Sequence, residues 1–499
     1  MSIAILRCRA LSGTEAPEVT IEVFLSGGLP GFSIVGMAET AVRESKDRVR
    51  GALMSSGFRF PQERITVSLG PADMKKTGGR FDLAIALGIL AASRQLTGAC
   101  LDQLEFYGEL GLDGGLRPAP GMLPAALRAR DAGNDIVVAA GNAAEASLAG
   151  GKVFAATTLL EVTAHLHGVA ELAAVEPGSA DVNPAACPDL VDVRGQSHAK
   201  RALEVAAAGG HNLLLVGPPG TGKSMLAERL PGLLPPMSEA EAIETAAVES
   251  VMGRPPELQR WRVRPFRSPH HTASAAALVG GGREPRPGEV SRAHNGVLFL
   301  DELPEFNRNV LEALREPIEA GRITISRATG QAEFPARFQL VAAMNPCPCG
   351  YLGDPVSDCG CSAERVAAYR GKLSGPLLDR IDLKVDVGRL PRELLRNKDP
   401  NAEASATVRA RVAEARQRQV QRAGRRNADL KGERLETDCE PDADGMRLLD
   451  RAAESFALSV RAYQRVLRVA RTIADLDGDG SVGARAVAEA LNLRGASVR

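Results

Sequence analysis

The first third of the chain mixes two spacings of apolar residues. Residues 19–24 and 65–69 alternate apolar and polar side chains, which is typical of strands with one buried face. Helical patterns occupy residues 41–54, 81–92 and 123–132. Residues 1–172 are therefore expected to form an α+β domain. A polar stretch with prolines and a glycine follows, and we interpret residues 173–191 as a linker.

The middle of the chain has short, continuous apolar runs that end in polar residues. These runs are residues 212–216, 296–300 and 339–343. Such runs are typical of strands buried on both faces of a parallel sheet. We assign residues 192–388 to an α/β core with a parallel sheet. Residues 389–499 lack strand patterning and are predicted to form helices, with one highly charged segment.

A glycine-rich turn connects the first apolar run to a helical segment. It reads Gly217, Pro218, Pro219, Gly220, Thr221, Gly222, Lys223 and Ser224. Between a strand and a helix, this spacing forms a phosphate cradle, because the glycines let backbone N–H groups face the β-phosphate. Lys223 is expected to reach the β- and γ-phosphates, and the Ser224 hydroxyl to bind Mg²⁺. The chain is therefore predicted to bind ATP with Mg²⁺.

The second apolar run ends in two carboxylates, Asp301 and Glu302. At the carboxyl end of a strand, downstream of a phosphate cradle, this pair forms the arrangement known as Walker B. Asp301 is expected to hold the Mg²⁺ shell, and Glu302 to orient and deprotonate the attacking water. The pair converts a nucleotide-binding site into one that hydrolyses ATP.

The composition of the chain limits the partners and the cellular location that are expected for this ATP site. The chain of 499 residues has 61 basic and 61 acidic side chains, so any site for a polyanion has to be local. Arg7 and Arg9 interrupt the apolar start, and the longest apolar stretch, residues 83–92, is far shorter than the ~20 residues of a membrane span. We expect a cytoplasmic protein of roughly two to four domains.

Four of the eight cysteines form two C-x-C pairs, Cys347 with Cys349 and Cys359 with Cys361. In a chain without an export signal, such a group suggests a metal site rather than disulfides. Four thiolates are able to surround one Zn²⁺ tetrahedrally and to stabilise a short loop. The alternative is four ordinary reduced thiols, because C-x-C is tighter than the usual C-x-x-C spacing.

Two further features belong to the core. Residues 225–296 are more than double the roughly 30 residues of one strand-and-crossover unit, so an insertion is expected there, with residues 264–288 as its candidate. A β-hairpin is predicted at residues 322–334, with its turn at residues 328–330, directly before the third apolar run.

Several segments of the sequence resemble motifs of the ComM/YifB family, which belongs to the Mg-chelatase-like branch of AAA+ ATPases. The most specific are residues 267–272, 287–291, 293–305 and 345–350. The likeness covers nearly the whole chain and implies an AAA+ P-loop core with a helical lid, preceded by a Lon protease-like domain of the ribosomal S5 type. Members are regarded as hexameric DNA motors, so the resemblance also implies a homohexameric ring and DNA as a partner.

The resemblance implies roles for three more residues. Asn345 matches sensor 1, an amide that helps to position the lytic water. Arg380 matches the arginine finger, which reaches the γ-phosphate held by a neighbouring subunit, and Arg461 matches sensor 2 on the helical lid. All three would present preorganised donors to the charge on the transferring phosphoryl group. Spacing alone would leave both arginines solvated or paired at the surface.

Residues 71–86 and 108–118 resemble the Lon protease-type domain. Proteolysis of that type needs a serine nucleophile and a lysine that takes its proton. The nucleophile position falls near Arg80 and Phe81, and the lysine position near Leu123. The domain is therefore expected to be a ring-forming scaffold rather than a protease.

Contacts to DNA are harder to locate. Arg327 at the hairpin turn is the sharpest candidate, because in this branch the hairpin is thought to project into the central pore, where a cation follows phosphates without reading bases. His270 and His271 could do likewise or pack within the insertion. Seven arginines against one acid in residues 409–426 either contact DNA or form a solvated helix face.

We therefore predict a hexameric AAA+ ATPase that moves on DNA, as a helicase or translocase on branched or recombining DNA. One alternative is a chelatase motor that serves Mg²⁺ insertion into a porphyrin, although such subunits usually lack a Lon-like domain. A second is an ATP-dependent protease or unfoldase, which the missing Ser/Lys pair opposes. A third is a scaffold that only binds ATP, which Glu302 and Arg380 disfavour.

Overall fold

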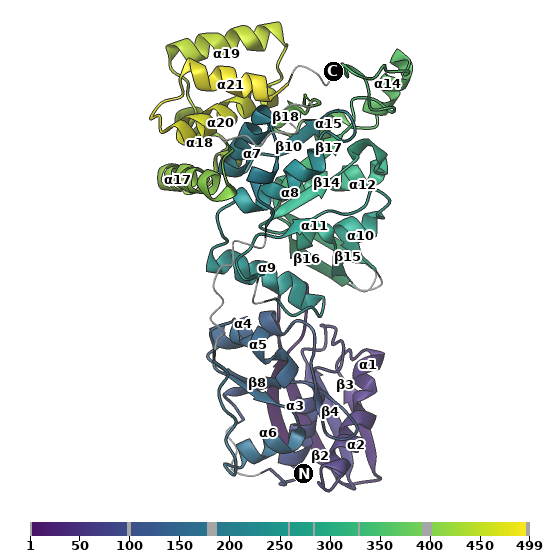
Figure 1. The fold of residues 1–499 in the computed structure, drawn as a ribbon. Helices are drawn as coiled ribbons and strands as arrows, with labels where there is room; N and C mark the ends of the chain where they lie inside the picture. The colour runs from purple at the N-terminus through teal and green to yellow at the C-terminus, as the bar shows by residue number, and fades with distance from the viewer. Residues whose placement is uncertain are drawn as a thin grey trace.

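A computed structural model describes residues 2–96, 101–176, 187–257, 260–282, 285–327, 330–391 and 402–495. Figure 1 shows the N-terminal domain, coloured purple to blue, at one end of an elongated molecule and the yellow C-terminal helices at the other, with a central domain between them. No helix among the described residues is long and apolar enough to cross a membrane.

The N-terminal domain is built on a seven-stranded mixed sheet in the order β3-β4-β2-β1-β5-β8-β9. Its strands are β1 (Ser2–Arg9), β2 (Glu18–Ser26), β3 (Gly31–Val35), β4 (Arg64–Gly70), β5 (Leu104–Tyr107), β8 (Asp135–Ala139) and β9 (Val153–Ala156), beside a small pair, β6 (Glu109–Leu110) and β7 (Leu116–Arg117). The two strands predicted from alternation are confirmed as β2 and β4. Val19, Ile21 and Val23 form the buried face of β2.

Helices cover this sheet. They are α1 (Thr40–Arg43), α2 (Ser45–Ser55), α3 (Asp82–Ala92), α4 (Met122–Asp131), α5 (Ala143–Ser147) and α6 (Leu159–Leu166). The three predicted helices are confirmed, the first of them divided into α1 and α2 at Glu44. α3 contacts β1 and β2 and is buried on nearly all sides, which explains why its sequence is almost uniformly apolar.

The central domain is a five-stranded parallel sheet in the order β11-β14-β17-β10-β18. Its strands are β10 (Leu213–Val216), β11 (Phe266–Arg267), β14 (Val297–Leu300), β17 (Gln339–Met344) and β18 (Leu383–Asp386), and its helices include α7 (Ser197–Gly209), α8 (Lys223–Leu233), α12 (Arg308–Ala313), α13 (Arg315–Ala320), α14 (Ala363–Arg370) and α15 (Gly375–Leu378). The three predicted runs are confirmed as β10, β14 and β17, every residue of which is buried. Because the strands are parallel, their carboxyl ends meet at one edge.

The predicted insertion and hairpin are both present. Residues 225–296 contain α9 (Glu239–Val251), α10 (Ala275–Val279), a small pair of β12 (Gly280–Gly281) and β13 (Arg286–Pro287), and α11 (Glu289–Arg292), in addition to β11 and most of α8. The hairpin consists of β15 (Arg322–Arg327) and β16 (Gly330–Pro335), paired up to Arg327 opposite Gly330. Residues 328–329 of the predicted turn lie outside the described residues.

The described part of the C-terminal region is helical, as predicted. It contains α17 (Ser405–Ala423), α18 (Glu433–Asp438), α19 (Ala443–Ser455), α20 (Val460–Asp477) and α21 (Ala484–Leu493). Several arginines of α17 bond within the molecule: Arg411 pairs with Glu204 at 2.6 Å, Arg416 donates to the carbonyl of Ala207 at 2.9 Å, and Arg422 pairs with Asp475 at 2.7 Å. This part of the basic segment therefore attaches α17 to α7 and α20 and is neither a simple solvated face nor a free cationic strip.

The N-terminal and central domains meet where α4 begins beside α9 (Figure 1). The Gly121 N–H donates to the Ser250 carbonyl at 2.8 Å, and the Leu123 N–H donates to the Ser250 hydroxyl at 3.3 Å. Ala246 of α9 belongs to the apolar core of the N-terminal domain. The first turn of α4 is thus capped by the insertion of the central domain.

Candidate nucleotide-binding and hydrolysis site

The glycine-rich turn joins the carboxyl end of β10 to the start of α8, as the sequence predicts. Gly220 and Gly222 have φ angles of +75° and +91°, a region that favours glycine. A Cβ at Gly217 would collide with the carbonyl oxygen of Val387, because the turn passes directly against the chain that leaves β18. These glycines allow backbone N–H groups to line a concave turn at the positive end of α8.

Lys223 lies inside this turn and is nearly buried. Its Nζ donates to the carbonyls of Gly217 at 2.8 Å and Pro218 at 2.9 Å, and to Oδ1 of Asn345 at 3.1 Å. Burial lowers the pKa of Lys223, while the charges of Asp301 and Glu302 oppose that shift. Asn345 follows β17 directly, so two neighbouring strands deliver the lysine and the amide to one point.

The hydroxyl of Ser224 donates to Oδ2 of Asp301 at 2.6 Å. Asp301 follows β14, and its Oδ1 accepts the backbone N–H of Glu302 at 2.9 Å. Hydroxyl and carboxylate oxygens are the protein ligands that Mg²⁺ prefers. The two residues predicted to bind Mg²⁺ therefore lie within direct reach of each other, and their oxygen donors fit that ion.

Glu302 has a left-handed backbone, with φ of +52°, and its side chain is 54% exposed. Its Oε2 lies 3.2 Å from Nδ1 of His271, whose ring faces Phe306 edge-on and lies against His270. His270 and His271 were expected either to contact DNA or to pack within the insertion, and the structure places His271 beside the carboxylate of Glu302. Sequence reasoning missed this contact. The signal available was that His271 follows β11, a strand parallel to β14.

Arg380 and Arg461 do not join this cluster. Arg380 precedes β18, and its backbone carbonyl accepts from the side chain of Asn212, at the amino end of β10. β10 spans four residues, so at about 3.3 Å per residue its two ends are roughly 13 Å apart. Arg380 therefore lies at the edge of the sheet opposite the phosphate cradle of its own chain.

A cleft of about 1320 Å³ occupies that opposite edge, and both arginines line it. The Arg380 guanidinium pairs with Glu319 and donates to the carbonyl of Pro376 at 2.6 Å. Arg461 is exposed on the first turn of α20. Further basic residues line the cleft, among them Arg337, Arg425, Arg426, Arg465 and Arg468. The two groups of predicted site residues thus occupy opposite edges of one sheet.

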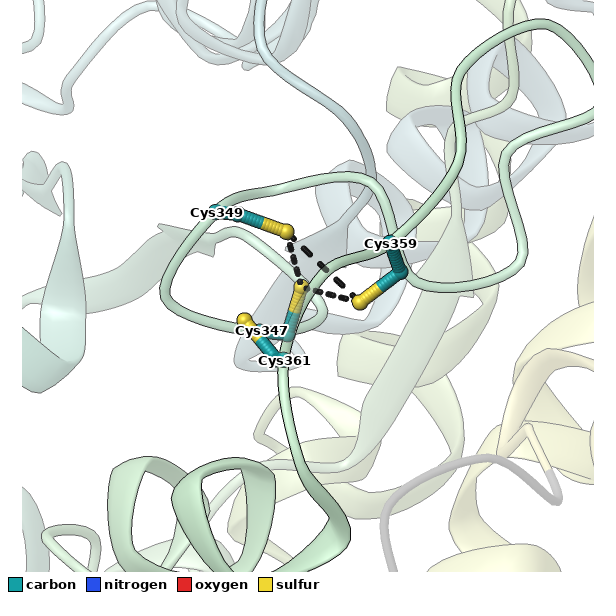
Figure 2. Close-up of side chains that lie close together, drawn as sticks. All are labelled: Cys347, Cys349, Cys359 and Cys361. Carbon is teal, nitrogen blue, oxygen red and sulfur yellow. Dashed lines mark hydrogen bonds between the residues drawn. The ribbon is translucent and has the colours of Figure 1, made fainter.

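The side chains of the four clustered cysteines converge on one point (Figure 2), in the loop that follows Asn345. Their sulfur atoms all lie within 4.8 Å of one another, and Cys347 is 3.4 Å from Cys349 and 3.6 Å from Cys359. Sulfurs bound tetrahedrally to Zn²⁺ at about 2.3 Å would be roughly 3.8 Å apart. The thiols fit a structural zinc ion, and the cluster could hold a metal.

The cysteine loop also contacts the phosphate cradle. Gly350, with φ of +87°, passes so close to the turn that a Cβ would lie 2.7 Å from Cδ of Pro219. The loop that carries the cysteines therefore lies against both Asn345 and the cradle.

Arg327, the candidate DNA contact, is exposed at the end of β15. Its guanidinium lies over the β12–β13 pair, where a Cβ on Gly281 would be 2.9 Å from Nη2. Hairpin and insertion therefore lie side by side.

The positions that Lon-type proteolysis would use carry other groups. Arg80 is buried and donates to the carbonyls of Arg9, at 3.2 Å, and Pro120. Phe81 and Leu123 are fully buried. A fixed cation and apolar side chains offer neither a nucleophile nor a base there.

A parallel sheet with a phosphate cradle and Walker B carboxylates at one edge, an insertion before Walker B and a hairpin after it together define an AAA+ ATPase of the magnesium-chelatase type. Family models agree. "Magnesium chelatase, subunit ChlI" matches residues 189–395, "Subunit ChlI of Mg-chelatase" matches residues 21–142, and "Magnesium chelatase, subunit ChlI C-terminal" matches residues 402–494.

Relatives that align over nearly the whole chain identify the family within this class. The chain is 51% identical to the competence protein ComM of Haemophilus influenzae, over 99% of this chain and 98% of that protein. It is 49% identical to the YifB protein of Salmonella typhimurium, over 99% and 97%. The chain therefore belongs to the ComM/YifB family of Mg-chelatase-like AAA+ ATPases. The magnesium-chelatase 38 kDa subunit of Rhodobacter capsulatus is more distant, at 29% identity over 58% of this chain and 81% of that protein.

Proposed function

We propose that this chain is one subunit of a homohexameric ring that hydrolyses ATP to move along DNA, as a helicase or translocase on branched or recombining DNA. One observation carries the proposal: Lys223, Ser224 and Asp301 lie at one edge of the sheet, and Arg380 lies at the other. A chain with this layout holds two half-sites that face away from each other. A ring joins each half-site to the complementary one of the next subunit.

Within one chain, the cradle and the Walker B pair perform the chemistry. Lys223 binds the β- and γ-phosphates, and Ser224 and Asp301 hold Mg²⁺, which would neutralise charge on the phosphates. Glu302 accepts a proton from the water that attacks the γ-phosphorus, while the bond to the ADP oxygen breaks. Asn345 orients that water from the end of β17.

Arg380 and Arg461 complete the site of a neighbouring subunit. Each presents a permanent cation at the cleft, where the neighbour's triphosphate would sit. Arginine suits this role because it stays charged and its donors form a planar fork that matches phosphate oxygens. In this arrangement Arg461 serves as sensor 2 for the neighbour's nucleotide, since its own cradle lies at the other edge.

DNA is proposed as the polymer inside the ring. Arg327 is the favoured contact, because it is exposed at the end of a hairpin and adjoins the insertion that carries His271. One arginine from each subunit would give a circle of cations that follows phosphates without base specificity.

The remaining parts support the motor. The cysteines Cys347, Cys349, Cys359 and Cys361 are proposed to bind a structural Zn²⁺ that fixes the loop after Asn345. The proposed domains are residues 1–172, a linker at residues 173–191, a core at residues 192–388 and a lid at residues 389–499. The first of these serves as a scaffold for the ring.

The experiment that tests the proposal measures ATP hydrolysis without DNA and with single-stranded, duplex and forked DNA, using Glu302→Gln protein to measure contaminating activity. We expect stimulation by DNA, largest with forked or single-stranded substrate. ATP hydrolysis that no DNA alters would contradict DNA as the substrate and would favour a motor for another cargo, such as the chelatase alternative.

A further inference from the structure

Arg465 lies one helical turn after Arg461 on α20 and lines the same cleft as Arg380. Its side chain is only 9% exposed, and its Nε lies 3.3 Å from Oδ1 of Asp382. Its Nη1 is buried and has no hydrogen-bond partner among the described residues. A buried guanidinium with an unused donor, at a cleft lined by several other arginines, is costly to keep unless a ligand uses that donor.

Asp382 connects Arg465 to the base of the cradle strand. Its Oδ2 accepts the backbone N–H of Asn212 at 3.0 Å, directly before β10 begins. The side chain of Asn212 donates to the Arg380 carbonyl at 2.8 Å and accepts from the Leu340 N–H of β17 at 2.8 Å. The Asn212–Asp382 junction thus holds together the amino ends of the strands whose carboxyl ends carry the cradle and Asn345.

We propose that Arg465 is a third arginine that binds the terminal phosphates of the neighbouring copy's nucleotide, and that it leaves Asp382 when it does so. The inference rests on the proposed function, in which that nucleotide enters the cleft. A triphosphate carries several negative charges against the single charge of Asp382, so it competes well for one guanidinium. No covalent step is involved.

The exchange gives each subunit a means of sensing its neighbour. When Arg465 leaves, Asp382 keeps its bond to the Asn212 N–H but is no longer paired with a cation from the cleft. The start of β10 is then held differently, and this change is transmitted along the strand to the phosphate cradle at its other end. Nucleotide binding in one subunit is thereby coupled to the cradle of the next, so hydrolysis should rise cooperatively with ATP concentration.

The test uses Arg465→Gln protein, alone and mixed with Lys223→Ala protein. Charged hydrogen bonds contribute about 1.5–3 kcal/mol, so the variant alone should lose roughly 10- to 100-fold in ATP hydrolysis and its cooperativity. Mixed rings should regain activity, because Lys223→Ala subunits supply an intact Arg465 to the intact cradle of the variant. Arg447→Gln removes an exposed arginine from α19 and is the matched control, expected to behave as wild type.

The outcomes separate this inference from the proposed function. If Arg380→Ala mixed with Lys223→Ala recovers activity but the Arg465→Gln mixture does not, Arg465 acts only within its own chain and the inference is overturned. If neither mixture recovers, the arrangement across subunits fails as a whole. If Arg465→Gln does not fold, Arg465→Lys provides the test, because lysine keeps a positive charge at this position. The lysine variant should retain part of the activity and regain more in mixed rings. Full cooperative activity in Arg465→Lys and Arg465→Gln alike would also overturn the inference.

Discussion

Replacing Glu302 with glutamine should separate ATP binding from hydrolysis. The amide has the size of the carboxylate but accepts no proton from the attacking water. General-base assistance contributes roughly 10²- to 10⁴-fold, so turnover should fall by about that factor. Binding should survive, because Lys223 keeps its partners Gly217, Pro218 and Asn345, and Ser224 keeps Asp301.

The structure also predicts the direction of the change in affinity. The Glu302 carboxylate acts electrostatically on Lys223, where it opposes the fall in pKa that burial causes. Removing this negative charge beside a site for a polyanion should leave the dissociation constant of ATP equal or lower. The effect should be modest, since the carboxylate is 54% exposed and screened by water.

Phosphate release and titration with a fluorescent ATP analogue measure the two quantities at one salt concentration. Glu305→Gln is the matched control, because Glu305 is also exposed, lies three residues further along and pairs with Lys372 at 3.3 Å. It should hydrolyse ATP as wild type does. Wild-type turnover in the Glu302 variant, or loss of its ATP binding, would refute the Walker B assignment.

Two further predictions concern the cysteine loop and the hairpin. Purified protein should contain about one zinc ion per chain, and replacing both Cys347 and Cys349 with serine should remove it. Wild-type protein that is fully folded but free of metal would show that the cluster consists of ordinary thiols. Arg327→Ala should keep basal ATP hydrolysis but lower its stimulation by DNA. The dependence of DNA binding on the logarithm of salt concentration should also become less steep, by about one for each phosphate that Arg327 neutralises. The control Arg322→Ala, at the base of the hairpin, should change neither the stimulation nor the salt dependence. An unchanged DNA response in Arg327→Ala would remove that residue from the proposed pore.

Local chemistry explains how much of the site the sequence predicted. Lys223 and Asp301 each come after a short apolar run. Such runs are typical of strands that are buried on both faces of a parallel sheet, so the positions of both residues relative to the sheet could be predicted. The carboxyl ends of such strands share an edge, so the sequence predicted that Ser224 and Asp301 serve one Mg²⁺ site, and their hydrogen bond agrees with that proximity.

Contacts that depend on packing between distant segments were not foreseeable. His271 contacts Glu302 from the turn after β11, and only the position of that turn beside a strand parallel to β14 points to the contact. Ser250 caps α4 across a domain boundary for a similar reason. In sequence, the arginines of α17 fit either a DNA contact or a solvated helix face, yet Arg416 and Arg422 have carbonyl and carboxylate partners inside the molecule. Charge patterning counts cations but does not identify their partners.

We propose that no single chain holds a complete active site, because Lys223 and Arg380 lie at opposite edges of the sheet. Mixing Arg380→Ala with Lys223→Ala protein tests it most directly, with sizing in the presence of ATP to verify that both variants assemble and exchange subunits. Each variant alone should be inactive, since an arginine finger contributes roughly 10³- to 10⁵-fold. Mixed rings should recover part of the wild-type rate, because an intact cradle then meets an intact finger. Mixed rings that form and stay inactive at every ratio would contradict the account.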